Sequence, residues 1–193
     1  MITSHRDILT PAMYSTVKTA VFDPGTPWYS LSTDYYNIQN PDMYSHAWAH
    51  LAYSLDSPPS HLGDMMLMAS LSALDRANEP VNKIIRIRLG LHTVSPVSRL
   101  GSPHVDYNLP HKTALIYLTS SDGDTLVYNQ KYDPNSNTDT YQYFMETYQG
   151  RVSVAATSTP EENKMICFDG MHYHSSSSPT NSAKRVTINI NYV

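Results

Sequence analysis

The alternation of apolar and polar positions predicts one helix in the first half of the chain. Apolar residues recur at helical spacing from Leu62 to about residue 78. Ser60 precedes this stretch and is placed to cap the helix, whereas Pro80 follows it and cannot continue it. The preceding residues, 1–57, are rich in Pro, Tyr, Asp and Asn, and they predict only short strands and turns.

From residue 83 the period of the pattern changes to two, as in half-buried strands. The first of these strands has an aliphatic face made by Ile85, Ile87, Leu89 and Leu91. Arg86 and Arg88 lie on its other face, where they either line a pocket or contact solvent, and we favour solvent. Further strands are expected at 112–119, 125–129, 152–156, 165–168, 171–175 and 186–193.

Turn signals separate these strands. Asp122-Gly123 predicts a tight turn into the strand at 125–129, and Asp169-Gly170 predicts a turn into the strand at 171–175. Residues 131–150 are polar and rich in tyrosine, which favours a long loop or an insertion near the mouth of a site. Many short strands, one helix and no βαβ rhythm indicate a mainly β fold, namely a β-barrel-like jelly roll with a supporting N-terminal helix.

The length of 193 residues fits a single domain. We expect N-terminal strands and the supporting helix in 1–82, and the β core in 83–193. No basic segment followed by an apolar core opens the chain, and no window approaches the length of a membrane span. A cytoplasmic location without membrane partners is therefore expected.

Charge and cysteine content exclude some classes of function. The formal net charge is −4 and the lysines and arginines form no run, so binding driven by bulk charge to nucleic acid or to anionic membranes is not expected. Cys167 is the single cysteine, which excludes an internal disulfide and a thiolate zinc site. Its apolar neighbours predict a buried, unreactive thiol.

Two short histidine motifs indicate a metal site. The first is His104-Val105-Asp106, and the second is His172-Tyr173-His174. Side chains at positions i and i+2 of a strand share a face, so the first motif offers an imidazole beside a carboxylate. A later strand that supplies one more histidine completes the facial triad of non-haem Fe(II) oxygenases, which leaves coordination positions open for chemistry. His172 and His174 share a face, and from the residues alone either one could be this third ligand.

The remaining histidines that stand alone are assigned structural or surface roles, because a lone histidine is seldom a metal ligand. These are His5, His46, His50, His61 and His92.

The segments around these motifs resemble the 2-oxoglutarate/Fe(II)-dependent dioxygenase superfamily, and within it the small prolyl-4-hydroxylase-like members, including stand-alone ones found in bacteriophages. The likeness covers about residues 83–193. It rests on His104–Tyr107, Thr113–Leu118, Asp122–Thr125, Phe168–Pro179 and Arg185–Ile190. It implies a double-stranded β-helix, which is a jelly roll, and the host-cell cytoplasm as the location if the chain is of phage origin.

Carried over position by position, the resemblance implies that Fe(II) is held by His104, Asp106 and His174. It implies that the distal carboxylate of 2-oxoglutarate is bound by Arg185, Thr187 and Tyr117. His174 is favoured over His172 because its spacing to Arg185 is similar to that of the family. Lys184 is an alternative base for the cosubstrate, but the Val-Thr pattern after residue 185 favours Arg185. Tyr117 could instead be a packed core tyrosine.

The activity that the resemblance implies is the hydroxylation of an aliphatic C–H bond, with O2 and 2-oxoglutarate as cosubstrates. A prolyl residue of a peptide or protein is the leading substrate, and a small molecule is the other. Related halogenases lack the carboxylate ligand, so Asp106 favours hydroxylation. The nucleic-acid demethylases of this superfamily carry a second arginine shortly after the one that binds the cosubstrate. No arginine follows Arg185 here, which disfavours nucleic acid as the substrate. Two alternatives are a non-catalytic jelly-roll module with a structural metal or none, and a cupin-type metalloenzyme that does not use 2-oxoglutarate.

Overall fold

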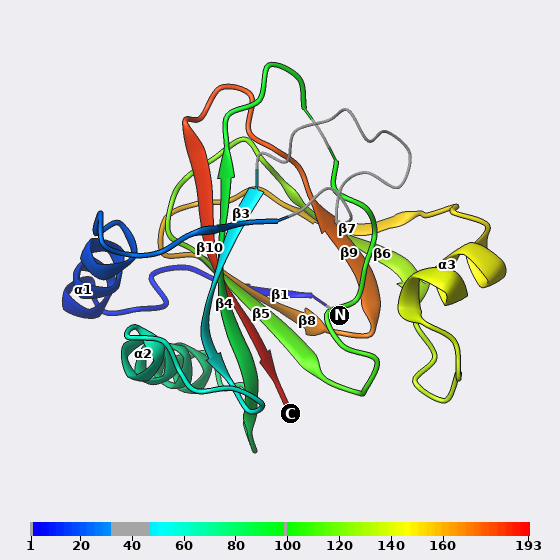
Figure 1. The fold of residues 1–193 in the computed structure, drawn as a ribbon, viewed down its shortest axis with the longest axis horizontal. Helices are drawn as coiled ribbons and strands as arrows, with labels where there is room; N and C mark the ends of the chain where they lie inside the picture. Colours follow the sequence, from blue (N-terminus) through cyan, green and yellow to red (C-terminus); the bar gives the residue numbers. More distant parts are fainter. Residues whose placement is uncertain (1, 32–46, 99) are drawn as a thin grey trace.

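Two antiparallel sheets face each other in the computed structural model, which describes residues 2–31, 47–98 and 100–193 (Figure 1). The seven-stranded sheet has the order β1-β8-β5-β10-β4-β3-β2, and the three-stranded sheet has the order β7-β6-β9. The larger sheet consists of β1 (Thr3–His5), β8 (Met165–Asp169), β5 (Lys112–Tyr117), β10 (Lys184–Tyr192), β4 (Ile84–Thr93), β3 (Ala47–Ser54) and β2 (Tyr29–Ser30). The smaller sheet consists of β7 (Val154–Ser158), β6 (Thr125–Lys131) and β9 (His172–Ser176).

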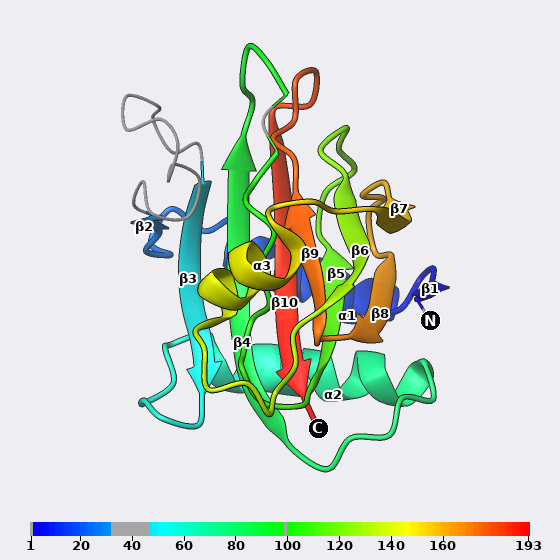
Figure 2. The same ribbon diagram turned by 90° about the vertical axis from the view of Figure 1, so that its right-hand side faces the viewer.

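Within the described residues, three helices lie outside this sandwich. They are α1 (Pro11–Val21), α2 (Gly63–Arg76) and α3 (Thr140–Tyr148). Figures 1 and 2 show α1 and α2 on the outer face of the larger sheet and α3 beyond the smaller sheet. The predicted mainly β jelly roll is confirmed, and the strands expected after residue 83 are present except for the short one around 104–106. The division at residue 82 stays a prediction, and positions 32–46 of the segment expected to hold short strands lie outside the described residues.

The alternation in β10 separates two chemical environments. Val186, Ile188 and Ile190 are fully buried in the core that α1 and α2 share with the larger sheet. The intervening polar residues face the space between the sheets, where Thr187 and Asn189 line a cavity. Burial of the aliphatic side thus fixes the orientation of the polar side.

Cys167 belongs to the same apolar core, where burial raises the pKa of its thiol to about 12, so the prediction of a buried thiol is confirmed. Within the described residues, no helix has the length and apolar character needed to cross a membrane.

The helix α2 was predicted, but its start was not. The hydroxyl of Ser60 accepts a hydrogen bond from the backbone N–H of Leu62, and the helix begins only at Gly63, after an N-cap at Leu62 without a side-chain bond. Ser60 also contacts Nε2 of His50, at 2.8 Å. The predicted capping role is therefore wrong, because Ser60 serves the turn that precedes the helix.

Two further helices were not expected. The first, α1, begins with Pro11 after Thr10, whose hydroxyl accepts a hydrogen bond from the N–H of Met13; this is a start signal that the sequence carries. The second, α3, lies in the segment 131–150 that was predicted as a loop. Its Phe144 packs against Tyr173 of β9 with ring centroids 4.8 Å apart, so aromatic contact with the smaller sheet stabilises this helix.

The predicted tight turn at Asp122-Gly123 is also wrong. The strands on either side of it, β5 and β6, belong to different sheets, and residues 118–124 cross between them. The carboxylate of Asp122 accepts hydrogen bonds from the backbone N–H groups of Thr180, Asn181 and Ser182 and from the Thr180 hydroxyl. Asp122 therefore fastens this crossing to the loop that leads into β10.

The hydrogen bonds of Asp122 predict a contribution to stability that depends on pH. Burial acts to raise the pKa of Asp122, but hydrogen bonds from the Thr180 side chain and from the backbone of 180–182 together hold it well below its usual range. A depressed folded-state pKa stabilises the protein above the unfolded pKa, near 3.9, and this contribution is lost as the pH falls below it. In chemical denaturation, Asp122→Asn is expected to be less stable than wild type at pH 7, with the difference shrinking below about pH 4. An equal difference at pH 7 and pH 3 would contradict this assignment.

Candidate metal centre

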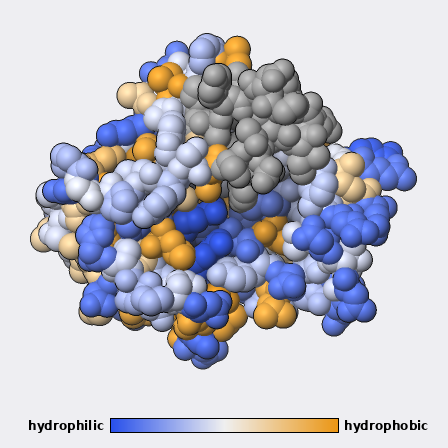
Figure 3. All heavy atoms as spheres, viewed as in Figure 1, coloured by the Kyte–Doolittle hydropathy of each residue, from blue (hydrophilic) through white to orange (hydrophobic). Residues whose placement is uncertain are grey.

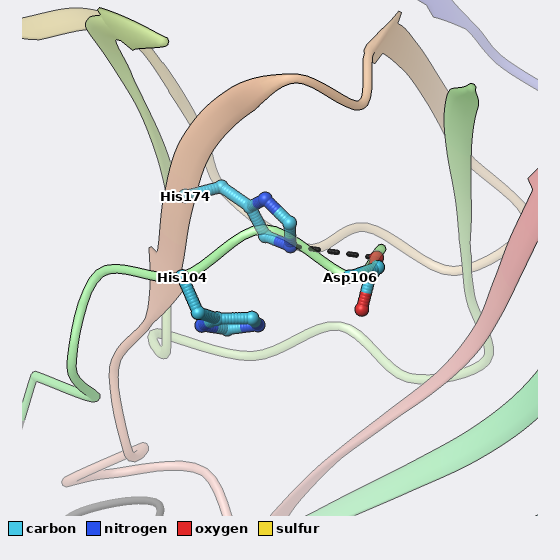
Figure 4. Close-up of side chains that lie close together, drawn as sticks. All are labelled: His104, Asp106 and His174. Atoms are coloured by element: carbon cyan, nitrogen blue, oxygen red, sulfur yellow. Dashed lines mark ion pairs between the residues drawn. The ribbon is translucent and has the colours of Figure 1, made fainter. Parts of the chain in front are cut away.

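Three side chains converge between the two sheets (Figure 4). One nitrogen of His104, one carboxylate oxygen of Asp106 and one nitrogen of His174 all lie within 4.8 Å of one another. His174 belongs to β9, and His104 pairs with it in an isolated antiparallel bridge. Asp106 lies two residues further along, in a bend. The expected strand around 104–106 is thus reduced to one bridge, yet the three side chains meet.

Hydrogen bonds set the tautomers of both imidazoles. Nδ1 of His104 lies 3.0 Å from the carbonyl oxygen of Ser102, and Nδ1 of His174 lies 3.2 Å from that of His172. Because a carbonyl oxygen only accepts, each Nδ1 carries the proton, and a neutral ring then has its lone pair on Nε2. This arrangement is typical of histidines that bind a metal through Nε2.

The charge states suit a divalent cation. Burial, with the neighbouring His174, lowers the pKa of His104 to about 3, and burial also lowers the pKa of His174. Burial acts to raise the pKa of Asp106, but the Arg86 guanidinium, with His174 and Arg88, holds the pKa of that carboxyl well below its usual range. At neutral pH the group offers two neutral imidazoles and one carboxylate, the protonation states that metal ligation requires. The donor set therefore fits non-haem iron.

Side chains from β4 and β10 hold the carboxylate of Asp106. Nη2 of Arg86 donates to Oδ1 at 2.7 Å, and the amides of Asn191 and Asn189 donate to Oδ2 at 2.9 and 3.2 Å. Arg86 is therefore not solvated as expected: its side chain is only 18% exposed and lies over the ring of Tyr107. Arg88 lines the cavity beside the centre.

Neither asparagine was singled out in the sequence. The available signal was the run of polar residues at alternate positions of β10, which continues from Arg185 and Thr187 through Asn189 and Asn191. Asn189 has its side-chain oxygen buried without a hydrogen-bond partner in the described part of the chain.

A cavity extends from the two histidines to the residues expected to bind the cosubstrate (Figure 3 shows hydrophilic residues in the hollow between the sheets). Arg185 and Thr187 both line it and are almost fully buried. Nη2 of Arg185 donates to the Thr125 hydroxyl at 2.7 Å, and the Tyr117 hydroxyl donates to the same oxygen at 2.9 Å. Thr125 thus lies with the predicted residues at this end of the cavity, although the sequence indicated it only as the last residue of the segment Asp122–Thr125.

Lys184 and His172, the alternatives to Arg185 and His174, both lie away from the proposed binding positions. Lys184 is exposed on the opposite side of β10, with its ammonium 3.9 Å from the ring centroid of Phe22, so it does not line the cavity. Nδ1 of His172 lies 2.7 Å from the carbonyl oxygen of Tyr128, and His172 is outside the group that could hold a metal. His174 is the histidine that lies with His104 and Asp106.

Two of the histidines predicted to have structural or surface roles are buried. His50 is buried between the carbonyl oxygen of Pro27 and the hydroxyl of Ser60, each 2.8 Å away, so its structural role is confirmed. His92 lines the cavity instead, where burial, Arg185 and Arg88 lower its pKa to about 3. His46 lies outside the described residues.

No protein-family model matches the sequence, and no curated protein sequence matches it either. Solved structures do match. The epimerase SnoN from nogalamycin biosynthesis, in complex with Fe3+, alpha ketoglutarate and nogalamycin RO, is 12% identical over 100% of this chain and 78% of SnoN, with a TM-score of 0.64. The protein shares the fold of SnoN. HygX from Streptomyces hygroscopicus, with nickel, 2-oxoglutarate and hygromycin B bound, is 11% identical over 99% of this chain and 82% of its own, with a TM-score of 0.60.

A prolyl hydroxylase from Trichoplax adhaerens, in complex with a hypoxia inducible factor peptide fragment, is 12% identical over 99% of this chain and 82% of its own, with a TM-score of 0.57. At these identities the likeness establishes the jelly-roll fold, and the chemistry must be argued from the side chains.

Proposed function

We propose that this protein is an Fe(II)- and 2-oxoglutarate-dependent dioxygenase whose iron is held by His104, Asp106 and His174. The observation that carries the proposal is the convergence of two neutral imidazoles and one ionised carboxylate at a cavity between the sheets of this fold. Three protein ligands leave positions open for cosubstrate and O2. Bound iron would supply the oxidative decarboxylation of 2-oxoglutarate and the oxidation of the substrate.

Arg185 is proposed to bind the distal carboxylate of 2-oxoglutarate. Its guanidinium is planar and can grip a carboxylate through two hydrogen bonds. The Thr125 hydroxyl accepts from both Arg185 and Tyr117, so this oxygen orients the guanidinium at one end of the cavity. Thr187 lines the same cavity, and its hydroxyl is proposed to donate a hydrogen bond to the distal carboxylate.

Hydroxylation of an aliphatic C–H bond is the proposed outcome, because Asp106 occupies the position where related halogenases lack a carboxylate. A prolyl residue of a peptide or protein is the proposed substrate, supported by the prolyl hydroxylase among the similar structures. A small molecule is the second candidate, supported by SnoN and HygX, which were solved with nogalamycin RO and hygromycin B. Membership of the bacteriophage group and a cytoplasmic location stay predictions from the sequence.

Anaerobic titration of the purified apoprotein with Fe(II) and then 2-oxoglutarate tests the proposal. We expect the weak visible metal-to-ligand charge-transfer band of 2-oxoglutarate chelated to Fe(II). Glutarate, which has the same chain length and no 2-oxo group, is the matched control and should give no band. Iron binding without the band would favour the cupin-type alternative, and failure to bind iron would favour the non-catalytic module.

A further inference from the structure

The three residues of the metal centre are not positioned in the same way. His104 and His174 are locked together by reciprocal backbone hydrogen bonds, with N–O distances of 3.0 and 2.9 Å. Asp106 follows this bridge in a bend and belongs to no strand. The backbone ladder therefore places both imidazoles but leaves the carboxylate to be placed by other contacts.

A closed ring of side-chain hydrogen bonds supplies those contacts. Nη2 of Arg86 donates to Oδ1 of Asp106 at 2.7 Å, and Nε of the same guanidinium donates to Oδ1 of Asn191 at 3.1 Å. The amide of Asn191 then donates to Oδ2 of Asp106 at 2.9 Å, which closes the ring. Arg86 and Asn191 are direct partners in the register of β4 and β10, so two paired strands of the larger sheet anchor the carboxylate.

The surroundings of this ring restrict its movement. Asn191 is fully buried, and its amide also donates to the Thr113 hydroxyl of β5 at 3.1 Å. The guanidinium of Arg86, which bonds Asp106, also lies over the ring of Tyr107, with its central carbon 4.9 Å from the ring centroid. The side chain of Asp106 is only 1% exposed, so water cannot replace these donors.

We propose that Arg86, acting through Asp106 and together with Asn191, is a positioning residue for the metal centre. This inference rests on the proposed function. The charge of Arg86 by itself has the opposite effect, because a guanidinium beside a ligand carboxylate repels an incoming cation. When a neutral residue replaces Arg86, loss of positioning therefore predicts weaker Fe(II) binding, whereas loss of the charge predicts tighter Fe(II) binding.

The test is anaerobic measurement of Fe(II) affinity, by competition with a chromophoric chelator, for wild type, Arg86→Gln and Arg86→Lys. Loss of a partner that orients a metal ligand typically lowers metal affinity ~10–100-fold, and this weakening is expected for Arg86→Gln. Arg86→Lys keeps the charge but cannot bond Asp106 and Asn191 together with one planar group, so any loss of Fe(II) affinity relative to wild type reports positioning alone, and a loss is expected. Wild-type affinity in Arg86→Lys, or tighter binding in folded Arg86→Gln, would overturn the proposal.

A spectroscopic measurement separates positioning from a loss of stability. At saturating Co(II), the visible absorption of Arg86→Gln is expected to differ from that of wild type, because the carboxylate would approach the metal in a changed orientation. An unchanged spectrum would count against positioning. Arg76→Gln is the matched control, since it removes one exposed arginine at the end of α2 and should leave affinity and spectrum unchanged. Failure of wild type to bind Fe(II) would overturn the proposed function as well, whereas binding with unaffected Arg86 variants would overturn this inference alone.

Discussion

Replacing Asp106 with alanine is expected to weaken Fe(II) binding by at least about 100-fold. Loss of a residue that only hydrogen-bonds a metal ligand already lowers affinity by up to about that factor, and Asp106 is itself a proposed ligand. The variant also loses the only anionic group among the three side chains. Turnover of 2-oxoglutarate should fall to background. Fe(II) affinity by anaerobic titration and succinate formation are the measurements.

Two controls make this result interpretable. Asp64→Ala removes an exposed carboxylate from the first turn of α2 and should bind Fe(II) like wild type. Asp106→Ala also leaves the partly buried guanidinium of Arg86 without its ion-pair partner, so thermal unfolding must be measured to establish that the variant is folded. A folded Asp106→Ala variant with normal activity would eliminate the proposed triad.

Replacing Arg185 with alanine is expected to abolish tight binding of 2-oxoglutarate while Fe(II) stays bound. Truncating one member of a buried, hydrogen-bonded charge pair costs about 2–5 kcal/mol. At about 1.4 kcal/mol per tenfold change, the affinity for 2-oxoglutarate should fall by roughly 30-fold or more. The measurement is the 2-oxoglutarate concentration needed for the charge-transfer band at fixed, saturating Fe(II).

Lys184 provides the matched control for this experiment. It precedes Arg185 in the chain, but its ammonium lies near Phe22, away from the cavity. Lys184→Ala should therefore bind 2-oxoglutarate like wild type. The reverse pattern, with Lys184→Ala impaired and Arg185→Ala normal, would transfer the cosubstrate site to the lysine.

The candidate site was partly accessible from the sequence. The spacing of His104 and Asp106 and the later His174 indicated a group of metal ligands, and the structure brings the three together. Thr125 and Asn191 were not identified, because a lone threonine or asparagine in a strand has no spacing that marks a partner. Their roles depend on contacts with Arg185 and Asp106, which lie far from them in the chain.

The helices show a related limit. The apolar spacing of α2 is strong enough to be recognised without a partner surface. By contrast, α3 buries only Phe144, and its other residues are at least partly exposed. Its stability depends on aromatic contacts with Tyr173 of β9, which a local pattern does not contain.

The sequence alone determined which residues share a face. Strict alternation separates Ile87 from Arg86 in β4, and Ile188 from Asn191 in β10. It could not determine whether the polar side meets water or encloses a cavity, because both environments tolerate the same residue types. The tertiary structure decided this by placing a second sheet opposite the polar face, which makes Arg86, predicted to contact solvent, a partly buried partner of Asp106.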